Sequence, residues 1–202
     1  RAVPPAQAAR SARRNAATPT TRASQPAGQT VRCFVALQPD DSARDRLDAL
    51  AGERHARFAH SRRMRRENLH LTLAFVGSLP CEIARRLAAR LAALPAEAFD
   101  WMLDEVGAFG GARVLWAGGS SPPLQALADR SRRLLDELAV PFDRKPFVPH
   151  VTLLRKLPRD ALRQAGGPIE PPIAWRVGAP VLLVSATGAQ GTRYTAMSAG
   201  NG

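Results

Sequence analysis

One short pattern occurs twice in this chain, each time inside a run of apolar residues. The first copy is His-Leu-Thr-Leu at residues 70–73, within ENLHLTLAFVG, and the second is His-Val-Thr-Leu at residues 150–153, within PFVPHVTLLRK. Short apolar runs bounded by glycine, proline or charged residues are typical of β-strands. The sequence therefore predicts two strands that each carry one polar pair.

Alternation along a strand decides which of these side chains can act together. Residues i and i+2 point to the same face of a strand, so His70 and Thr72 share one face, as do His150 and Thr152. If a pseudo-twofold axis relates the two halves, both pairs face one cleft, where two imidazoles and two hydroxyls meet. The side chains expected on the opposite, apolar faces are Leu71, Leu73 and Phe75 in the first strand and Val151 and Leu153 in the second.

The other segments alternate between helical and extended patterns. Helical spacing of apolar residues covers 40–58, 80–94 and 121–140. The stripe expected to be buried in the second of these helices is Ile83, Leu87, Leu91 and Leu94. Further predicted strands cover 31–37, 98–109, 113–118, 173–177, 180–187 and 192–198. This order predicts an α+β fold of two lobes, a pseudo-twofold duplication in which antiparallel sheets face a central cleft and helices cover the outer faces.

Charge separates the first part of the chain from the rest. The formal net charge is +12, and residues 1–32 contain six arginines and no acid. A segment with so little large apolar surface cannot offset its ordering entropy. We therefore expect residues 1–30 to be a disordered basic tail and residues 31–202 to be the folded domain. The composition also fits an organellar transit peptide, but the segment has few bulky residues for an amphipathic helix, so a plain tail is the favoured interpretation.

Several classes of protein are disfavoured by what the sequence lacks. It has no apolar window near the ~18 residues of a membrane span. It also has no HExxH, no cysteine cluster and no aspartate-rich loop for a metal. Its two cysteines, Cys33 and Cys81, form no CxxC pair, which favours a reducing compartment. We expect a monomeric cytoplasmic protein with no membrane association, no metal and no other cofactor.

The paired motifs resemble the 2H phosphoesterase superfamily. NLHLTLAFVG together with PFVPHVTLLR is similar to its RNA 2′,3′-cyclic phosphodiesterase branch, historically called 2′-5′ RNA ligase. The similarity extends from Val31 onward and includes RCFVAL, RVLWAG and GTRYTAM. The resemblance implies metal-independent opening of 2′,3′-cyclic phosphates, at RNA ends or in small cyclic nucleotides, to 2′-phosphates.

The resemblance also implies roles for the four motif residues. His70 would be the proton donor to the leaving oxygen, and His150 the proton acceptor from water. Two imidazoles suit this work because imidazole titrates near neutral pH, although the residues alone do not decide which is the acid. Thr72 and Thr152 would donate hydrogen bonds to the phosphoryl oxygens, where negative charge develops.

Arginines beside the two motifs are further candidates. Arg155 follows the second motif and is a candidate phosphate contact, although alternation puts it opposite His150 unless the strand ends or bulges there. Arg62 and Arg63 belong to a basic connector, residues 61–67, that could guide an RNA backbone to the cleft. For that connector a solvated basic loop is the favoured alternative.

Two aromatic residues are candidates for contact with RNA. Phe34, in the first predicted strand, could stack on a terminal base, although a core phenylalanine is the favoured interpretation. Tyr194, in the last predicted strand, is a candidate for lining the cleft.

Two rival functions use the same fold. One is a non-catalytic RNA- or nucleotide-binding module, which a missing motif histidine or threonine would favour. The other is a 2′-5′ RNA ligase that runs the reaction in reverse, which microscopic reversibility leaves open.

Overall fold

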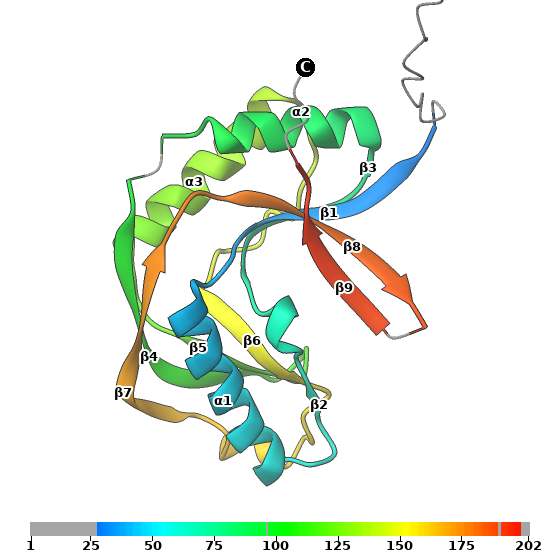
Figure 1. Cartoon of the computed structure of the whole chain (residues 1–202). Helices are drawn as coiled ribbons and strands as arrows, with labels where there is room; N and C mark the ends of the chain where they lie inside the picture. Colours follow the sequence, from blue (N-terminus) through cyan, green and yellow to red (C-terminus); the bar gives the residue numbers. More distant parts are fainter. Residues whose placement is uncertain (1–27, 96, 190, 199–202) are drawn as a thin grey trace, which may run out of the picture.

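The order of strands in the sheet mirrors itself about its middle. The computed structural model describes residues 28–95, 97–189 and 191–198 (Figure 1), so nearly all of the expected tail, residues 1–30, lies outside the described residues. The strands are β1 (Thr30–Leu37), β2 (Arg62–Arg63), β3 (Leu71–Pro80), β4 (Phe99–Phe109), β5 (Val114–Gly118), β6 (His150–Arg155), β7 (Gly167–Val177), β8 (Val181–Gly188) and β9 (Gly191–Ala196). The helices are α1 (Asp41–Arg57), α2 (Cys81–Ala92) and α3 (Pro122–Glu137), with 3₁₀ turns η1 (Arg66–Asn68) and η2 (Ala161–Arg163).

The two predicted lobes are the two halves of this sheet. The order is β7-β4-β5-β6-β3-β1-β8-β9, with β2 beside β6, and the pairs are antiparallel. We call β9, β8, β1 and β3 the first lobe, and β6, β5, β4 and β7 the second lobe. The lobes join at one residue pair, Leu71 with Val151. These are the middle residues of the two His-x-Thr copies, and an antiparallel pair between equivalent residues is what a local twofold axis produces. The predicted α+β duplication is confirmed.

The helices do not follow the lobes in sequence order. α2 and α3 pack on strands of the first lobe, whereas α1, which directly follows β1, packs on β6 and β7 of the second lobe (Figure 1). Asp40 explains part of this crossing. One of its carboxylate oxygens accepts from Ala43 N at 2.8 Å as the cap of α1, and the other accepts from Arg176 N of β7 at 2.9 Å.

The core-facing side of α2 differs from the predicted stripe. Ile83 is 39% exposed, while Leu87 and Leu91 are buried together with Ala84 and Ala88. Burying two alanines lets the helix lie close to the sheet, and this turns the bulkier Ile83 outward. The prediction for Ile83 was therefore wrong. Among the described residues, no helix has the length and apolar character needed to cross a bilayer.

Each motif strand contains a bulge directly after its threonine. In the first lobe Ala36 pairs with Thr72 but Val35 pairs with Ala74, so Leu73 is an extra residue in β3. In the second lobe the same shift makes Leu153 the extra residue in β6, because Trp116 pairs with Thr152 and Leu115 with Leu154. The two lobes thus share an irregularity at the same point of the motif.

The bulges move the residue three places after each threonine to the cleft side. Phe75 and Arg155 occupy these equivalent positions, and both line the same cavity. The prediction that Phe75 would lie on the apolar face was therefore wrong, because it assumed an unbroken alternation. The same irregularity puts Arg155 on the side of His150.

Candidate active site

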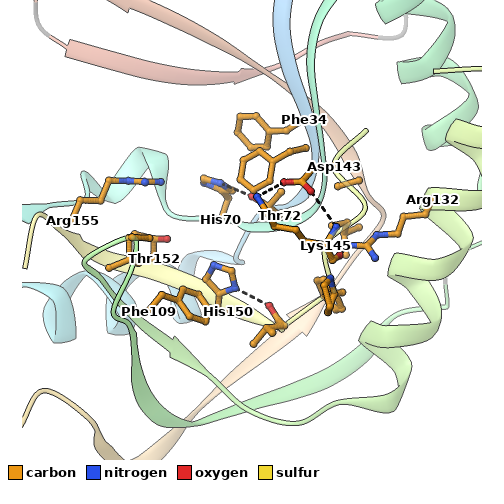
Figure 2. Close-up of a pocket in the computed structure, with 18 of the residues that line it drawn as sticks. Phe34, His70, Thr72, Phe109, Arg132, Asp143, Lys145, His150, Thr152 and Arg155 are labelled. Carbon is orange, nitrogen blue, oxygen red and sulfur yellow. Dashed lines mark hydrogen bonds and ion pairs between the residues drawn. The ribbon is translucent and has the colours of Figure 1, made fainter. Parts of the chain in front are cut away.

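A cavity of about 400 Å³ lies where the two lobes meet, and both His-x-Thr pairs line it. Figure 2 shows His70 and Thr72 on one side of this space and His150 and Thr152 on the other. Arg155 stands at one end, and Lys145 and Arg132 stand at the opposite end. The structure therefore brings together the four residues that the sequence singled out.

The two imidazoles are held in the same way. Nδ1 of His70 lies 2.7 Å from the carbonyl oxygen of Asn68, and Nδ1 of His150 lies 2.7 Å from that of Val148, each two residues earlier in the chain. A carbonyl oxygen can only accept, so Nδ1 carries the hydrogen in both rings. Nε2 is then the atom of each ring that can take up or release a proton in the cavity.

Threonine geometry differs between the two sides. Nε2 of His70 lies 3.1 Å from Oγ1 of Thr72, so the hydroxyl donates to the neutral imidazole. His70 is also the more enclosed ring, at 9% exposure, whereas His150 is half-buried. The first lobe thus holds its histidine more tightly than the second lobe does.

Aromatic rings fix both imidazoles from the side. His70 packs against Phe34 at 4.9 Å and meets the edge of Tyr194 at 5.1 Å. His150 meets the edge of Phe109 at 4.9 Å and lies 6.2 Å from Trp116. Packing of this kind restricts the rotamers of both catalytic candidates.

The charge states of both histidines are set mainly by burial. Desolvation lowers the pKa of His70 to about 4 and also lowers the pKa of His150. The positive charge of Arg155 lowers the pKa of each further, while the hydrogen bonds to backbone carbonyls act in the opposite direction. Both imidazoles are therefore neutral at pH 7 in the protein alone. An anion bound beside Arg155 would counter its charge and favour protonation.

Phe34 is buried, which agrees with the favoured interpretation, whereas Phe75 takes the exposed position on the cavity. Phe34 lines the cavity but is only 5% exposed, because it packs between His70 and Tyr194. Phe75 is 55% exposed, with its ring 6.0 Å from that of Phe34. Tyr194 lines the cavity, as expected. Sequence reasoning missed Phe75 because a bulge leaves no signature in a single strand.

The basic connector is largely engaged with α1. Arg63 forms an ion pair with Asp48 at 2.7 Å, and Arg66 pairs with Asp45. Neither Arg62 nor Arg63 lines the cavity. The acidic residues of α1 thus neutralise much of the positive charge of the connector that was expected to guide RNA.

Asn68 is a further positioning residue that the sequence reasoning missed. Its carbonyl accepts from His70, its amide nitrogen donates to Thr192 O at 2.7 Å, and its amide oxygen accepts from Tyr194 N at 3.0 Å. Asn68 is buried, and these bonds tie the turn before His70 to β9. Its place directly before Leu-His in the motif is the only signal that the sequence offered.

Comparisons with known proteins place these features in one family. A family model described as the 2′-5′ RNA ligase superfamily matches residues 39–189. An RNA 2′,3′-cyclic phosphodiesterase of Aeropyrum pernix is 35% identical over 94 residues, 44% of this chain and 53% of the relative. The protein of that name from Escherichia coli is 36% identical over 91 residues, 44% of this chain and 52% of the relative. The chain thus spans about half the length of these curated relatives.

Solved structures agree with this over more of the chain. The crystal structure of E. coli LigT complexed with 3′-AMP aligns with a TM-score of 0.74 and 27% identity, covering 84% of this chain and 97% of that one. The crystal structure of TT0787 of Thermus thermophilus aligns with a TM-score of 0.67 and 28% identity, covering 83% of this chain and 95% of that one.

Proposed function

The chain belongs to the 2′-5′ RNA ligase superfamily, and from this premise we propose that it hydrolyses RNA 2′,3′-cyclic phosphate ends to 2′-phosphomonoesters with a pair of histidines. One observation carries the proposal. Nδ1 of each imidazole donates a hydrogen bond to a backbone carbonyl, and both rings line one cavity together with two threonine hydroxyls and Arg155. An acid, a base and donors for a phosphoryl group are all available there. The names of the relatives and the LigT complex with 3′-AMP support the same chemistry.

The reaction divides between the two histidines. Nε2 of His150 takes a proton from water as the water oxygen forms a bond to phosphorus. The bond between phosphorus and the 3′ oxygen breaks, and Nε2–H of His70 gives its proton to that oxygen. A 2′-phosphate and a 3′-hydroxyl result, and solvent then restores both protonation states.

Other side chains stabilise the charge that builds on phosphorus. The hydroxyls of Thr72 and Thr152 donate to the non-bridging oxygens, and Arg155 supplies a positive charge beside them. Thr72 is released to donate to the phosphate when His70 becomes protonated, because Nε2 of His70 then no longer accepts from its hydroxyl. The phosphate anion also raises the pKa of His70 when it binds, which gives the donor its proton.

The proposed chemistry needs no metal ion, since side chains supply both proton transfer and charge stabilisation. Within the described ranges, no three His, Cys, Asp or Glu side chains are grouped to hold one. The proposal includes the monomeric state and the cytoplasmic location expected from the sequence, and the free thiols of Cys33 and Cys81 are in keeping with a reducing compartment. A ligase running the reaction in reverse would use the same residues. A non-catalytic binding module would not need both imidazoles to be oriented toward the cavity.

An RNA oligonucleotide ending in a 2′,3′-cyclic phosphate tests the proposal. The protein is incubated with it in EDTA and in Mg²⁺, and the product is compared by chromatography with 2′- and 3′-phosphate standards. We expect the 2′-phosphate at equal rates in both conditions. A 3′-phosphate product, or turnover that disappears in EDTA and returns with a divalent ion, would contradict the proposed function.

A further inference from the structure

The catalytic cavity continues into a second one along the first lobe. This neighbouring cavity of about 540 Å³ shares five residues with the first: Phe34, Phe75, Asp143, Arg155 and Tyr194. It adds Arg32 and Ser185, which pair across β1 and β8. A groove thus runs from the histidines over the face of β1, β3 and β8, with room for more than the reacting group.

An exposed aromatic ring lies on the wall that the two cavities share. Phe75 is the most exposed large hydrophobic residue in the described part of the chain. The bulge in β3 holds it on the cleft side, where it pairs with Phe34 of β1. Any of the four nucleobases can stack on such a ring, because every base has a π-face.

Arg32 supplies a positive charge farther along the same groove. It precedes Phe34 by two residues on β1 and is exposed, and its guanidinium makes no hydrogen bond or ion pair with other described residues. The cations at the opposite end of the catalytic cavity are already engaged. There, Lys145 forms an ion pair with Asp143 at 2.9 Å, and Arg132 donates to Lys145 O at 3.0 Å. Arg32 is therefore the cation better placed to receive a phosphate.

We propose that this second cavity is a subsite for the penultimate nucleotide of an RNA strand, with its base against Phe75 and its phosphodiester near Arg32. The inference rests on the proposed function, and it adds that strand ends are preferred to mononucleoside cyclic phosphates. Phe75 contributes to RNA binding by stacking, which does not depend on the base, and Arg32 contributes to it by attraction to the phosphate.

Two substrates that share the reacting group test this subsite. kcat/KM is measured for a nucleoside 2′,3′-cyclic phosphate and for a dinucleotide that ends in the same cyclic nucleotide. Stacking of one base on an aromatic ring contributes roughly five- to hundredfold, so we expect the protein to prefer the dinucleotide by about tenfold or more. Phe75→Ala should remove most of this preference, Arg32→Ala part of it, and Phe75→Trp should retain it.

Matched variants control for unspecific effects. Met102→Ala removes another exposed apolar side chain, on β4, and Arg86→Ala removes an exposed arginine on α2; neither residue lines either cavity. Both should keep the preference of the unaltered protein, and thermal unfolding should show that all variants are folded. The subsite is overturned if the unaltered protein does not prefer the dinucleotide, or if that preference survives both Phe75→Ala and Arg32→Ala. In either case, turnover of the mononucleoside cyclic phosphate would still uphold the proposed function.

A binding measurement separates the two proposals completely. Fluorescence anisotropy gives the affinity for a labelled tetranucleotide with a 2′-phosphate end, whether or not the protein turns over a cyclic phosphate. If neither substrate is hydrolysed, the proposed function fails, and a roughly tenfold weaker affinity of Phe75→Ala still supports the subsite. Equal affinities of Phe75→Ala, Arg32→Ala and the unaltered protein would refute it.

Discussion

β3 and β6 present nearly the same backbone to the cleft and different chemistry upon it. In both strands the histidine donates to the carbonyl two residues earlier, and a bulge follows the threonine. At the position that the bulge turns inward, the first lobe has Phe75 and the second has Arg155. The twofold arrangement gives both lobes the same geometry, and in our proposals the side chain at this position contacts a phosphate in the second lobe and a base in the first lobe.

The histidines differ in the same manner. His70 is enclosed and accepts from Thr72, whereas His150 is half-buried. Burial lowers the pKa of His70, the proposed donor, to about 4. The difference between the lobes therefore does not assign the roles by itself, and His70 must gain its proton when a phosphate anion binds beside Arg155.

The largest expected effect is loss of either histidine. His70→Ala and His150→Ala should each lower kcat for a cyclic phosphate by roughly 10²–10⁴-fold, the usual range for one acid–base group. The double variant should cost much less than the product of the two losses, because the pair acts as a unit. Steady-state kinetics on folded variants measures this, and near-normal turnover by either single variant would contradict it.

Arg155→Ala should have the next largest effect, about 10²-fold on kcat, because it removes charge stabilisation from the transition state. Arg155 also lowers the pKa of both histidines, so its loss should raise both values. Phe75→Ala, the equivalent change in the first lobe, should leave both pKa values in place. NMR titration of the imidazoles compares the two variants, and identical shifts would show that the lobes are not differentiated here.

These residues also show how far the sequence alone reaches. Alternation predicted that His70 and Thr72 would share a face, because that depends only on local strand geometry. It failed for Phe75 and left Arg155 undecided, because a bulge depends on the register with a partner strand far away in the chain. The engagement of Arg63 by Asp48 is likewise a tertiary contact that no local pattern encodes.

Asn68→Ala should have a smaller effect than the histidine and arginine variants, with an expected loss in kcat of roughly tenfold. Asn68 ties the turn before His70 to β9 through its side chain, whereas the carbonyl that holds His70 remains in the variant. A positioning role predicts lower kcat with little change in KM. Asn68→Asp keeps the bond from Tyr194 N and should recover part of the activity. A fall in thermal stability with unchanged kcat would assign Asn68 a structural role only.

The pH dependence should be bell-shaped with its maximum on the acid side. The active form carries one proton on the pair, and the pKa of His70 is about 4 while that of His150 is lowered from 6.5. Above these values both imidazoles are neutral and the donor is lost, and below them the base is lost. The maximum of kcat/KM, which reports on the free protein, should therefore lie below pH 6.5. A maximum above pH 7.5 would be inconsistent with two buried, neutral histidines.

One measurement tests the division of labour between the lobes most directly. Each histidine variant is assayed with a cyclic phosphate and with a 3′-deoxynucleoside 2′-(p-nitrophenyl) phosphate, in which p-nitrophenolate replaces the 3′ oxygen as the leaving group and departs without a proton. His70→Ala should lose roughly 10²–10⁴-fold on the cyclic phosphate and far less on the aryl ester, while His150→Ala should lose activity on both. Equal losses of both variants on both substrates would contradict the acid–base pair, and rescue of His150→Ala instead would reverse the two roles.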